Sequence, residues 1–382
     1  MIRQLIRRCS KPESSAFHRF VSSLIAGAAW LSTLLLLLTA YSPFVSPEIF
    51  PLAGVVGLAF PLALGGTCFA LLCALLFAPR RSWIPLLGLL LSARAIAHYV
   101  PLHPTLPDDD PPAPLRIMTY NTLYLGSTAA GREDHLRYID EQKPDIVCLQ
   151  EIPLEKDIFD TFAQFAARSP YRYYALEQTE GMRQGIVSRY PITRTERLAA
   201  STSNAVWAHW LTLGDSLGAG GRQIIVLNCH LKSNTLSEAE REQFGEAVSP
   251  NASVDERSLL HAAVSMARKI GRASRIRAQM TDAVTRFIVR HAGTPIIVVG
   301  DFNDTPVSYP YQQMLSAGLK SAFAEAGTGI GRSFNQNGIF VRSDHGFVTP
   351  HCEVTSARID SDVTLSDHYP LLFTLRWSKQ QP

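Results

Sequence analysis

The chain has 382 residues, which is room for one large domain or two ordinary ones. Its 36 Lys and Arg against 33 Asp and Glu leave a net charge of +3, so no strong overall field directs it to nucleic acid. No pair of the six cysteines has the spacing of a metal site, and their number leaves the cellular compartment open.

Residues 1–100 are predicted to form a membrane region with about three transmembrane helices. Two apolar runs, about 21–45 and 49–77, are long enough to cross a bilayer as helices. A third run, about 83–100, is a weaker candidate because it carries Arg94 and His98. The alternative for this third run is an interfacial or core helix.

Basic residues set the expected orientation of these runs in a cell membrane. They precede the first run and separate the second from the third: Arg3, Arg7, Arg8, Lys11, Arg19, Arg80 and Arg81. With three spans, the N-terminus is cytoplasmic and the C-terminal domain extracytoplasmic. If the third run does not cross, that domain is cytoplasmic instead. A cleaved signal peptide is not expected, because a second long apolar run follows the first.

A spacer and a soluble domain are predicted to follow. Residues 101–114 are Pro-rich and acidic, a composition typical of a semi-rigid, extended linker. Residues 115–382 have the composition of a soluble α/β domain. Residues 234–256 are polar without a strand pattern, so we expect a surface insertion there, either a solvated loop or one that touches substrate.

Short strand-like runs and helical runs share residues 115–382. Helices are predicted at 131–142, 155–168, 259–291 and 310–317. Strands are predicted at 115–121, 145–151, 172–176, 185–192, 205–213, 223–233 and 295–301, and near Phe347, Val354 and 371–375. The helices flank a mostly β middle, which favours two packed sheets with helices outside them.

Polar side chains recur where strand-like runs end or the last one begins. They are Asn121, Glu151, Asn228, His230, Asp301, Asn303, Asp367 and His368. Residues two apart on a strand share a face, so these side chains are expected to meet at one rim of the sandwich. Carboxylates such as Glu151 and Asp367 suit Mg²⁺ or Mn²⁺, and a histidine can transfer protons near neutral pH. The set predicts metal-assisted phosphoryl chemistry, although each residue alone is more typical of a cap or turn.

Five segments in this order resemble the endonuclease/exonuclease/phosphatase superfamily: TYN, DIVCLQE, NCHLKS, GDFNDTP and SDHYPL. The resemblance covers about residues 115–376 and implies the deoxyribonuclease I-like fold. That fold is an α/β four-layer sandwich, in which two central mixed sheets are flanked by helices. The three-span N-terminus together with GDFNDTPVSY resembles a bacterial membrane-anchored branch of the superfamily.

The resemblance also implies which residues hold a metal. Glu151 resembles the metal-binding glutamate of the family, and Asn121 resembles the asparagine beside it. Asp367, next to the terminal histidine, is expected near the same ion. The implied cofactor is Mg²⁺ or Mn²⁺.

Catalytic roles carry over in the same way. His230 resembles the histidine that contacts phosphate or protonates the leaving group. Asp301 and Asn303 resemble the pair that aligns the attacking water and binds phosphate. His368 resembles the terminal catalytic histidine, and Asp344 the aspartate that fixes the tautomer of a histidine. The polar residue before Asp344 departs from the family pattern.

The resemblance implies a metal-dependent hydrolase of phosphate esters, first of all a nuclease or phosphodiesterase. A lipid head-group phosphodiesterase and a small-molecule phosphatase are the alternatives, and an inactive binding protein is disfavoured by the intact polar set. The basic helix at 259–291 could contact nucleic acid or an anionic membrane, or could be an ordinary solvated helix. The expected partners are a phosphoester substrate and the lipid bilayer, and the oligomeric state stays open.

Overall fold

The computed structural model of the protein describes residues 16–103, 114–214, 221–234, 256–336 and 339–378. It divides into two compact units, one made of Met1–Tyr41 and Ala59–Arg94 and the other of Ser42–Leu58 and Ala95–Pro382. Most of the predicted linker, and all but the end residues of the predicted insertion at 234–256, lie outside the described residues.

The first unit is helical. It contains α2 (Ala16–Tyr41), α4 (Phe60–Phe77), η3 (Pro79–Arg81) and α5 (Trp83–Leu91). Two helical segments, Arg19–Phe44 and Phe60–Phe77, are long and apolar enough to cross a membrane. The third predicted run forms two short helices, α5 and α6 (Ala93–Tyr99), with a break at Ser92.

The second unit contains two six-stranded mixed sheets. The first sheet has the order β13 (Cys352–Ile359), β14 (Leu371–Trp377), β1 (Leu115–Asn121), β2 (Ile146–Ile152), β4 (Arg183–Ser188) and β3 (Tyr173–Gln178). The second has the order β5 (Ile192–Ser201), β6 (Asn204–Thr212), β7 (Gln223–His230), β8 (Ile296–Asp301), β12 (Asp344–Val348) and β9 (Lys320–Ser321). A small ladder joins β10 (Phe334–Gln336) to β11 (Ile339–Val341).

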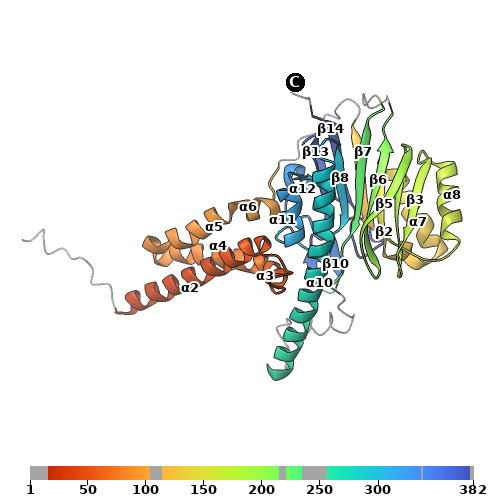
Figure 1. Ribbon diagram of the computed structural model, residues 1–382. Coiled ribbons are helices and arrows are strands. Elements are labelled where there is room, and N and C mark those ends of the chain that lie inside the picture. Colours follow the sequence, from red (N-terminus) through yellow and green to blue (C-terminus); the bar gives the residue numbers. More distant parts are fainter. Residues whose placement is uncertain (1–15, 104–113, 215–220, 235–255, 337–338, 379–382) are drawn as a thin grey trace, which may run out of the picture. The chain divides into compact units, whose positions relative to one another are not determined.

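Helices cover the outer faces of both sheets (Figure 1). The first sheet carries α7 (Ala129–Gln142) and α8 (Ile158–Arg168), with η4 (Leu123–Ser127) after β1. The second carries α10 (Glu256–Arg290) and α11 (Tyr309–Ser316), and α12 (Ala322–Ala326) lies near its edge. This arrangement confirms the predicted four-layer α/β sandwich.

The apolar strands are buried on both faces. Ile117 points into the core between the sheets, while the next residue, Met118, packs in the layer of α7 and α8. In the second sheet, Val226 points inward and Ile225 packs toward α10. Strands that are covered on both faces have continuous apolar sequences, which is why these segments show little alternation of apolar and polar residues.

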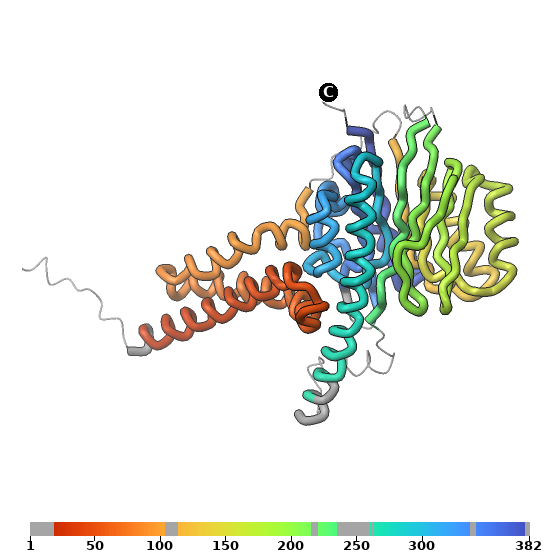
Figure 2. The backbone as a smooth tube through the Cα atoms, viewed as in Figure 1, coloured from red at the N-terminus to blue at the C-terminus, as the bar shows by residue number. Residues whose placement is uncertain are grey.

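Two segments of the predicted membrane region belong to the second unit. Residues 42–58 contain η2 (Ser42–Phe44) and α3 (Ala53–Leu58), and α3 lies beside α10 (Figure 2). Residues 95–103 include most of α6 and a bridge from Leu102 to Thr328. The compact unit around the two sheets therefore begins before residue 101.

Candidate active site

The pairing of strands brings polar residues to one rim. In the first sheet β1 runs parallel to β2, and Asn121 is paired with Gln150, one residue before Glu151. In the second sheet β7 runs parallel to β8, and His230 is paired with Asp301. Parallel neighbours end at the same edge of a sheet, so each sheet places its polar strand ends together.

Asn121 joins the two sheets at this rim. Its side-chain Nδ2 donates to Glu151 Oε1 at 3.1 Å and to Asp301 Oδ2 at 3.1 Å. The Oδ1 atom of the same side chain accepts from the Leu123 N–H at 3.3 Å. With only 1% of its surface exposed, Asn121 holds carboxylates from both sheets in one network.

Glu151 occupies an uncommon backbone conformation. Its φ is +56°, and it falls where the pairing of β2 with β4 shifts register between Leu149 and Ile152. A non-glycine residue in this region is strained, and the bulge turns its side chain toward the rim. Burial raises the pKa of Glu151, although the Asn121 bond opposes this, and 20% of the side chain stays exposed.

The turn after β8 is built around Asp301. Gly300 has φ +139°, and a Cβ there would lie 1.8 Å from the carbonyl oxygen of Cys229, so the neighbouring strand leaves room for glycine alone. Asn303, at φ +51°, donates its N–H to Asp301 Oδ1 at 2.8 Å. Its Nδ2 donates to Asp301 Oδ2 at 3.2 Å and to the Leu231 carbonyl at 3.0 Å.

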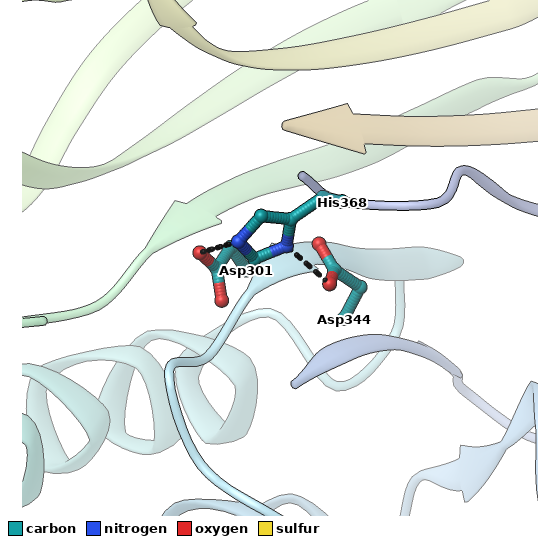
Figure 3. A group of neighbouring side chains, drawn as sticks. All are labelled: Asp301, Asp344 and His368. Atoms are coloured by element: carbon teal, nitrogen blue, oxygen red, sulfur yellow. Dashed lines mark hydrogen bonds and ion pairs between the residues drawn. The ribbon is translucent and has the colours of Figure 1, made fainter. Parts of the chain in front are cut away.

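His368 lies between two carboxylates (Figure 3). Its Nδ1 is 2.8 Å from Asp344 Oδ2, and its Nε2 is 3.8 Å from Asp301 Oδ2. Burial alone would lower the pKa of His368, but the charges of Asp344 and Asp301 outweigh it and raise the pKa to about 10. His368 is therefore a cation at neutral pH, oriented by Asp344.

Asp301 and His230 are buried groups with altered acidity. Burial raises the pKa of Asp301 to about 6, against the opposing charge of His368. Burial lowers the pKa of His230, and neither of its ring nitrogens has a hydrogen-bond partner among the described residues. The Nε2 atom of His230 lies 3.6 Å from Glu151 Oε1 and 3.9 Å from Asp301 Oδ2.

Asp367 lies at the margin of this group. The Ser366 hydroxyl is 3.4 Å from Asp367 Oδ1 and donates at 2.9 Å to the carbonyl of Asn121. The carboxylate of Asp367 adds to the rise in the pKa of Glu151, after burial, so the two acids lie within electrostatic reach. Of the eight residues that were assigned metal-binding or catalytic roles, seven are thus joined by direct contacts, and Asp367 is linked to them by charge.

The donor atoms of the rim fit a hard divalent cation. Asp301, Asp344 and His368 have ligand atoms within 4.8 Å of one another, although His368 can bind a metal only when it is unprotonated. The carboxylates of Glu151 and Asp301 both accept from Asn121 Nδ2. Asp344 Oδ1 and both nitrogens of His230 are buried polar atoms with no hydrogen-bond partner among the described residues, which is costly unless a bound group satisfies them. Burial raises the pKa values of Glu151 and Asp301, and an added positive charge would stabilise both carboxylates.

Two supporting pairs escaped the sequence analysis. Gln150 Nε2 donates to Asn228 Oδ1 at 2.8 Å, a second polar link between the sheets beneath the rim. Arg277 on α10 forms a buried ion pair with Asp304, at 3.1 Å from Nε to Oδ2, below the turn after β8. Gln150, Asn228 and Asp304 stand inside quoted motifs and Arg277 does not, but each pair joins residues distant in sequence, so local sequence carries no signal for the pairing.

Family comparison assigns most of the chain. The model described as "Endonuclease/Exonuclease/phosphatase family" matches residues 118–368. A second model, "Domain of unknown function (DUF8431)", matches residues 22–99. Among curated proteins, none matches the chain.

Solved structures with similar folds are remote in sequence. The human Nocturnin catalytic domain with bound sulfate is 20% identical over 70% of this chain and 95% of that chain, with a TM-score of 0.49. An endonuclease/exonuclease/phosphatase from Bacteroides vulgatus is 20% identical over 69% and 99%, with a TM-score of 0.49. The D. rerio TDP2 complexed with single strand DNA product is 15% identical over 69% and 99%, with a TM-score of 0.45.

Proposed function

The chain belongs to the endonuclease/exonuclease/phosphatase family, whose members are metal-dependent hydrolases of phosphate esters. From this membership we propose that it is a membrane-anchored phosphodiesterase of the nuclease type, dependent on Mg²⁺ or Mn²⁺. In this proposal a water molecule attacks the phosphodiester at the rim where the two sheets meet.

One observation carries the proposal. Residues far apart in sequence are in contact at one rim: Asn121 and Glu151 from the first sheet, and His230 and Asp301 from the second. His368 lies 3.8 Å from Asp301, so the rim supplies oxygen ligands, a buried carboxylate, a neutral histidine and a charged histidine in one place. Phosphoester hydrolysis needs these functions: charge neutralisation, alignment of water and assistance to the leaving group.

Glu151, with Asn121 beside it and Asp367 nearby, is proposed to hold the divalent cation. The Glu151 carboxylate is the most exposed of the contacting acids, whereas Asp344 and His368 are already bonded to each other. When bound, the cation supplies positive charge to the phosphate oxygens and increases the acidity of water.

Asp301 is proposed to align the attacking water and accept its proton. Its Oδ2 atom accepts hydrogen bonds from Asn121 and Asn303, which fix the position of the carboxylate. Burial raises its pKa to about 6, close to neutrality, where a general base is effective. Asn303 is also proposed to contact the phosphate.

The two histidines are proposed to act on the phosphate group. His368, kept charged by Asp344 and Asp301, would stabilise the negative charge that develops on the phosphate oxygens. His230 has ring nitrogens without a partner in the described residues, so one of them is available to a phosphate oxygen or to the leaving group. Asp344 would hold the His368 ring in orientation through their 2.8 Å bond.

A lipid head-group phosphodiesterase is the second candidate. Residues 42–58, between the two apolar helices, are part of the same compact unit as the rim. An enzyme attached in this way is held close to the head groups of its own membrane. A small-molecule phosphatase is retained as an outcome of the test.

A panel of substrates tests the proposal. The purified full chain in detergent, with Mg²⁺ or Mn²⁺, is given single-stranded and double-stranded DNA, RNA, sphingomyelin vesicles, and mono- and bis(4-nitrophenyl) phosphate. Hydrolysis of nucleic acid that stops in EDTA is expected, and hydrolysis of sphingomyelin alone would favour the second candidate. A folded chain that hydrolyses none of them would contradict both, as would activity that persists in EDTA.

A further inference from the structure

The segments 42–58 and 95–103 pack against the loop that follows Asp301. We propose that these two segments, called the brace below, position the candidate active site. They hold the strand that begins at Asp344 and residues 302–311, which comprise the loop after β8 and the start of α11 and are called the turn below. The effect on hydrolysis rests on the proposed function, whereas the effect on the turn does not. Three sets of contacts carry this inference.

Arg342 ties the end of α6 to the strand of Asp344. The side chain is 2% exposed and lies over the Phe323 ring, with its guanidinium carbon 4.3 Å from the ring centroid. Its Nη2 donates to the carbonyls of His98 and Tyr99, and its Nη1 donates to the Ile330 carbonyl at 2.7 Å. A buried guanidinium is costly unless its donors are satisfied, and here the C-terminal carbonyls of a helix satisfy two of its bonds.

A second contact runs from His98 through aromatic rings to the turn. His98 Nδ1 is 3.1 Å from the Tyr311 hydroxyl. The Tyr311 ring packs edge-to-face on His345, with centroids 5.0 Å apart. His345 Nε2 in turn is 2.9 Å from the carbonyl oxygen of Asp304. This path connects the brace to the residue beside Asn303.

The third set consists of close glycine contacts. A Cβ at Gly57 would lie 2.5 Å from the carbonyl oxygen of Val307, within the turn. A Cβ at Gly54 would lie 2.2 Å from Ser274 Oγ. That hydroxyl accepts a 2.9 Å bond from Arg277, the partner of Asp304. The backbone of α3 therefore touches the turn directly and touches the helix that supports it.

These contacts reach residues that adjoin the reacting groups without including them. Asp304 follows Asn303, and Arg342 is two residues before Asp344. The brace residues are thus positioning residues, and their loss should disturb geometry more than substrate binding. Small displacements at an active site can cost large factors in rate.

Matched glycine substitutions test the brace in the full chain. Gly57→Ala introduces the clash with Val307, whereas Gly65→Ala in α4 meets nothing within 4 Å. Both positions are helical, where alanine is intrinsically favoured, so a loss specific to position 57 reports the contact. With bis(4-nitrophenyl) phosphate, Gly57→Ala is expected to lower kcat about tenfold or more with little change in KM, and Gly65→Ala to match the wild type.

Hydrogen exchange gives a readout that does not depend on activity. Peptides covering residues 302–311 should exchange about tenfold faster in Gly57→Ala and at the wild-type rate in Gly65→Ala. If the wild type hydrolyses nothing, this comparison still tests the brace. Should Gly57→Ala fail to fold, Tyr311→Phe takes its place, because it removes the hydroxyl that contacts His98 and keeps the ring on His345. Unchanged exchange and unchanged kcat in the folded variant would overturn the inference.

Discussion

At the scale of single residues, the rim contains several residues in unfavourable backbone conformations or with buried polar atoms unpaired within the described part of the chain. Glu151 and Asn303 have positive φ, and His230 leaves two buried nitrogens without a partner among the described residues. Each feature costs free energy, and such costs gather at functional sites because the surrounding fold enforces them. Glu151 lies in β2, which pairs with β1 and β4, and Asn303 follows β8, which pairs with β7 and β12. The two sheets can therefore hold the strained residues in place.

Buried neutral histidines predict that the fold weakens in acid. Burial lowers the pKa of His209 to about 3, so the native state stays unprotonated while the unfolded chain protonates below about pH 6.5. Stability is therefore full above pH 6.5 and falls as the pH drops toward 3. Between pH 6.5 and 5.0 the loss from His209 is about 2 kcal/mol. It is measured as the shift in the thermal unfolding midpoint of the full chain.

His209→Gln serves as the test variant. Glutamine can still bond to Thr195, whose hydroxyl is 3.0 Å from His209 Nδ1, but it does not titrate. The variant should lose less stability between pH 6.5 and 5.0 than the wild type. An equal loss in both proteins would show that His209 does not contribute to the acid sensitivity.

At the scale of elements, the close pairing of β8 with β7 at the rim depends on Gly300. Gly300→Ala is expected to destabilise the protein by about 3 kcal/mol or more, because the added methyl group meets the carbonyl of Cys229 and φ is +139°. Gly293→Ala is the matched control, since a Cβ there meets nothing within 4 Å. The unfolding midpoint of each variant is compared with that of the wild type. Equal unfolding midpoints for the two variants would contradict the claim that Gly300 is required where β8 pairs with β7.

The strands that were predicted most closely are those buried on both faces. The predicted strands at 115–121 and 295–301 correspond closely to β1 and β8, because continuous apolar runs ended by polar residues are unambiguous. The strand β5 was not predicted: it is an edge strand whose exposed residues include Arg194 and Arg197. The helix α12 and strands β9 to β11 are too short to produce a periodic pattern.

The composition of the candidate site was easier to predict than its connections. Seven of the eight proposed site residues stand within the quoted motifs, and the eighth, Asp344, lies outside them. Their contacts depend on which strands pair, as when Asn121 meets Asp301 across the sheets. The ion pair of Arg277 with Asp304 joins a helix to a loop, and local sequence carries no signal for it.

At the scale of the whole molecule, the segments of the chain that make up the second unit bear on membrane topology. Residues 45–58 lie between the two candidate spans and belong to the same compact unit as the two-sheet domain, so a chain that spans the membrane is predicted to have both on one side of it. Basic residues precede the first span, and none lies in 42–58, which favours the extracytoplasmic side for that segment. The three-span arrangement predicts that the segment 83–99, which forms α5 and α6, returns across the bilayer.

A fusion to the C-terminus tests this topology. Alkaline phosphatase, which is active only outside the cytoplasm, should be active when fused after Pro382 in a bacterial host. Green fluorescent protein fused at the same position should stay dark if exported unfolded. The reverse pattern would place the domain in the cytoplasm and refute the three-span arrangement.

The central claim is that the rim hydrolyses phosphoesters with His368 oriented by Asp344. The most direct measurement is kcat of the full chain with the best substrate of the panel at saturating Mg²⁺, comparing the wild type with Asp344→Asn and with the exposed control Asp362→Asn. We predict a fall of about 10²–10⁴-fold in kcat for folded Asp344→Asn and no change for the control. Full turnover in a folded Asp344→Asn variant would contradict the account.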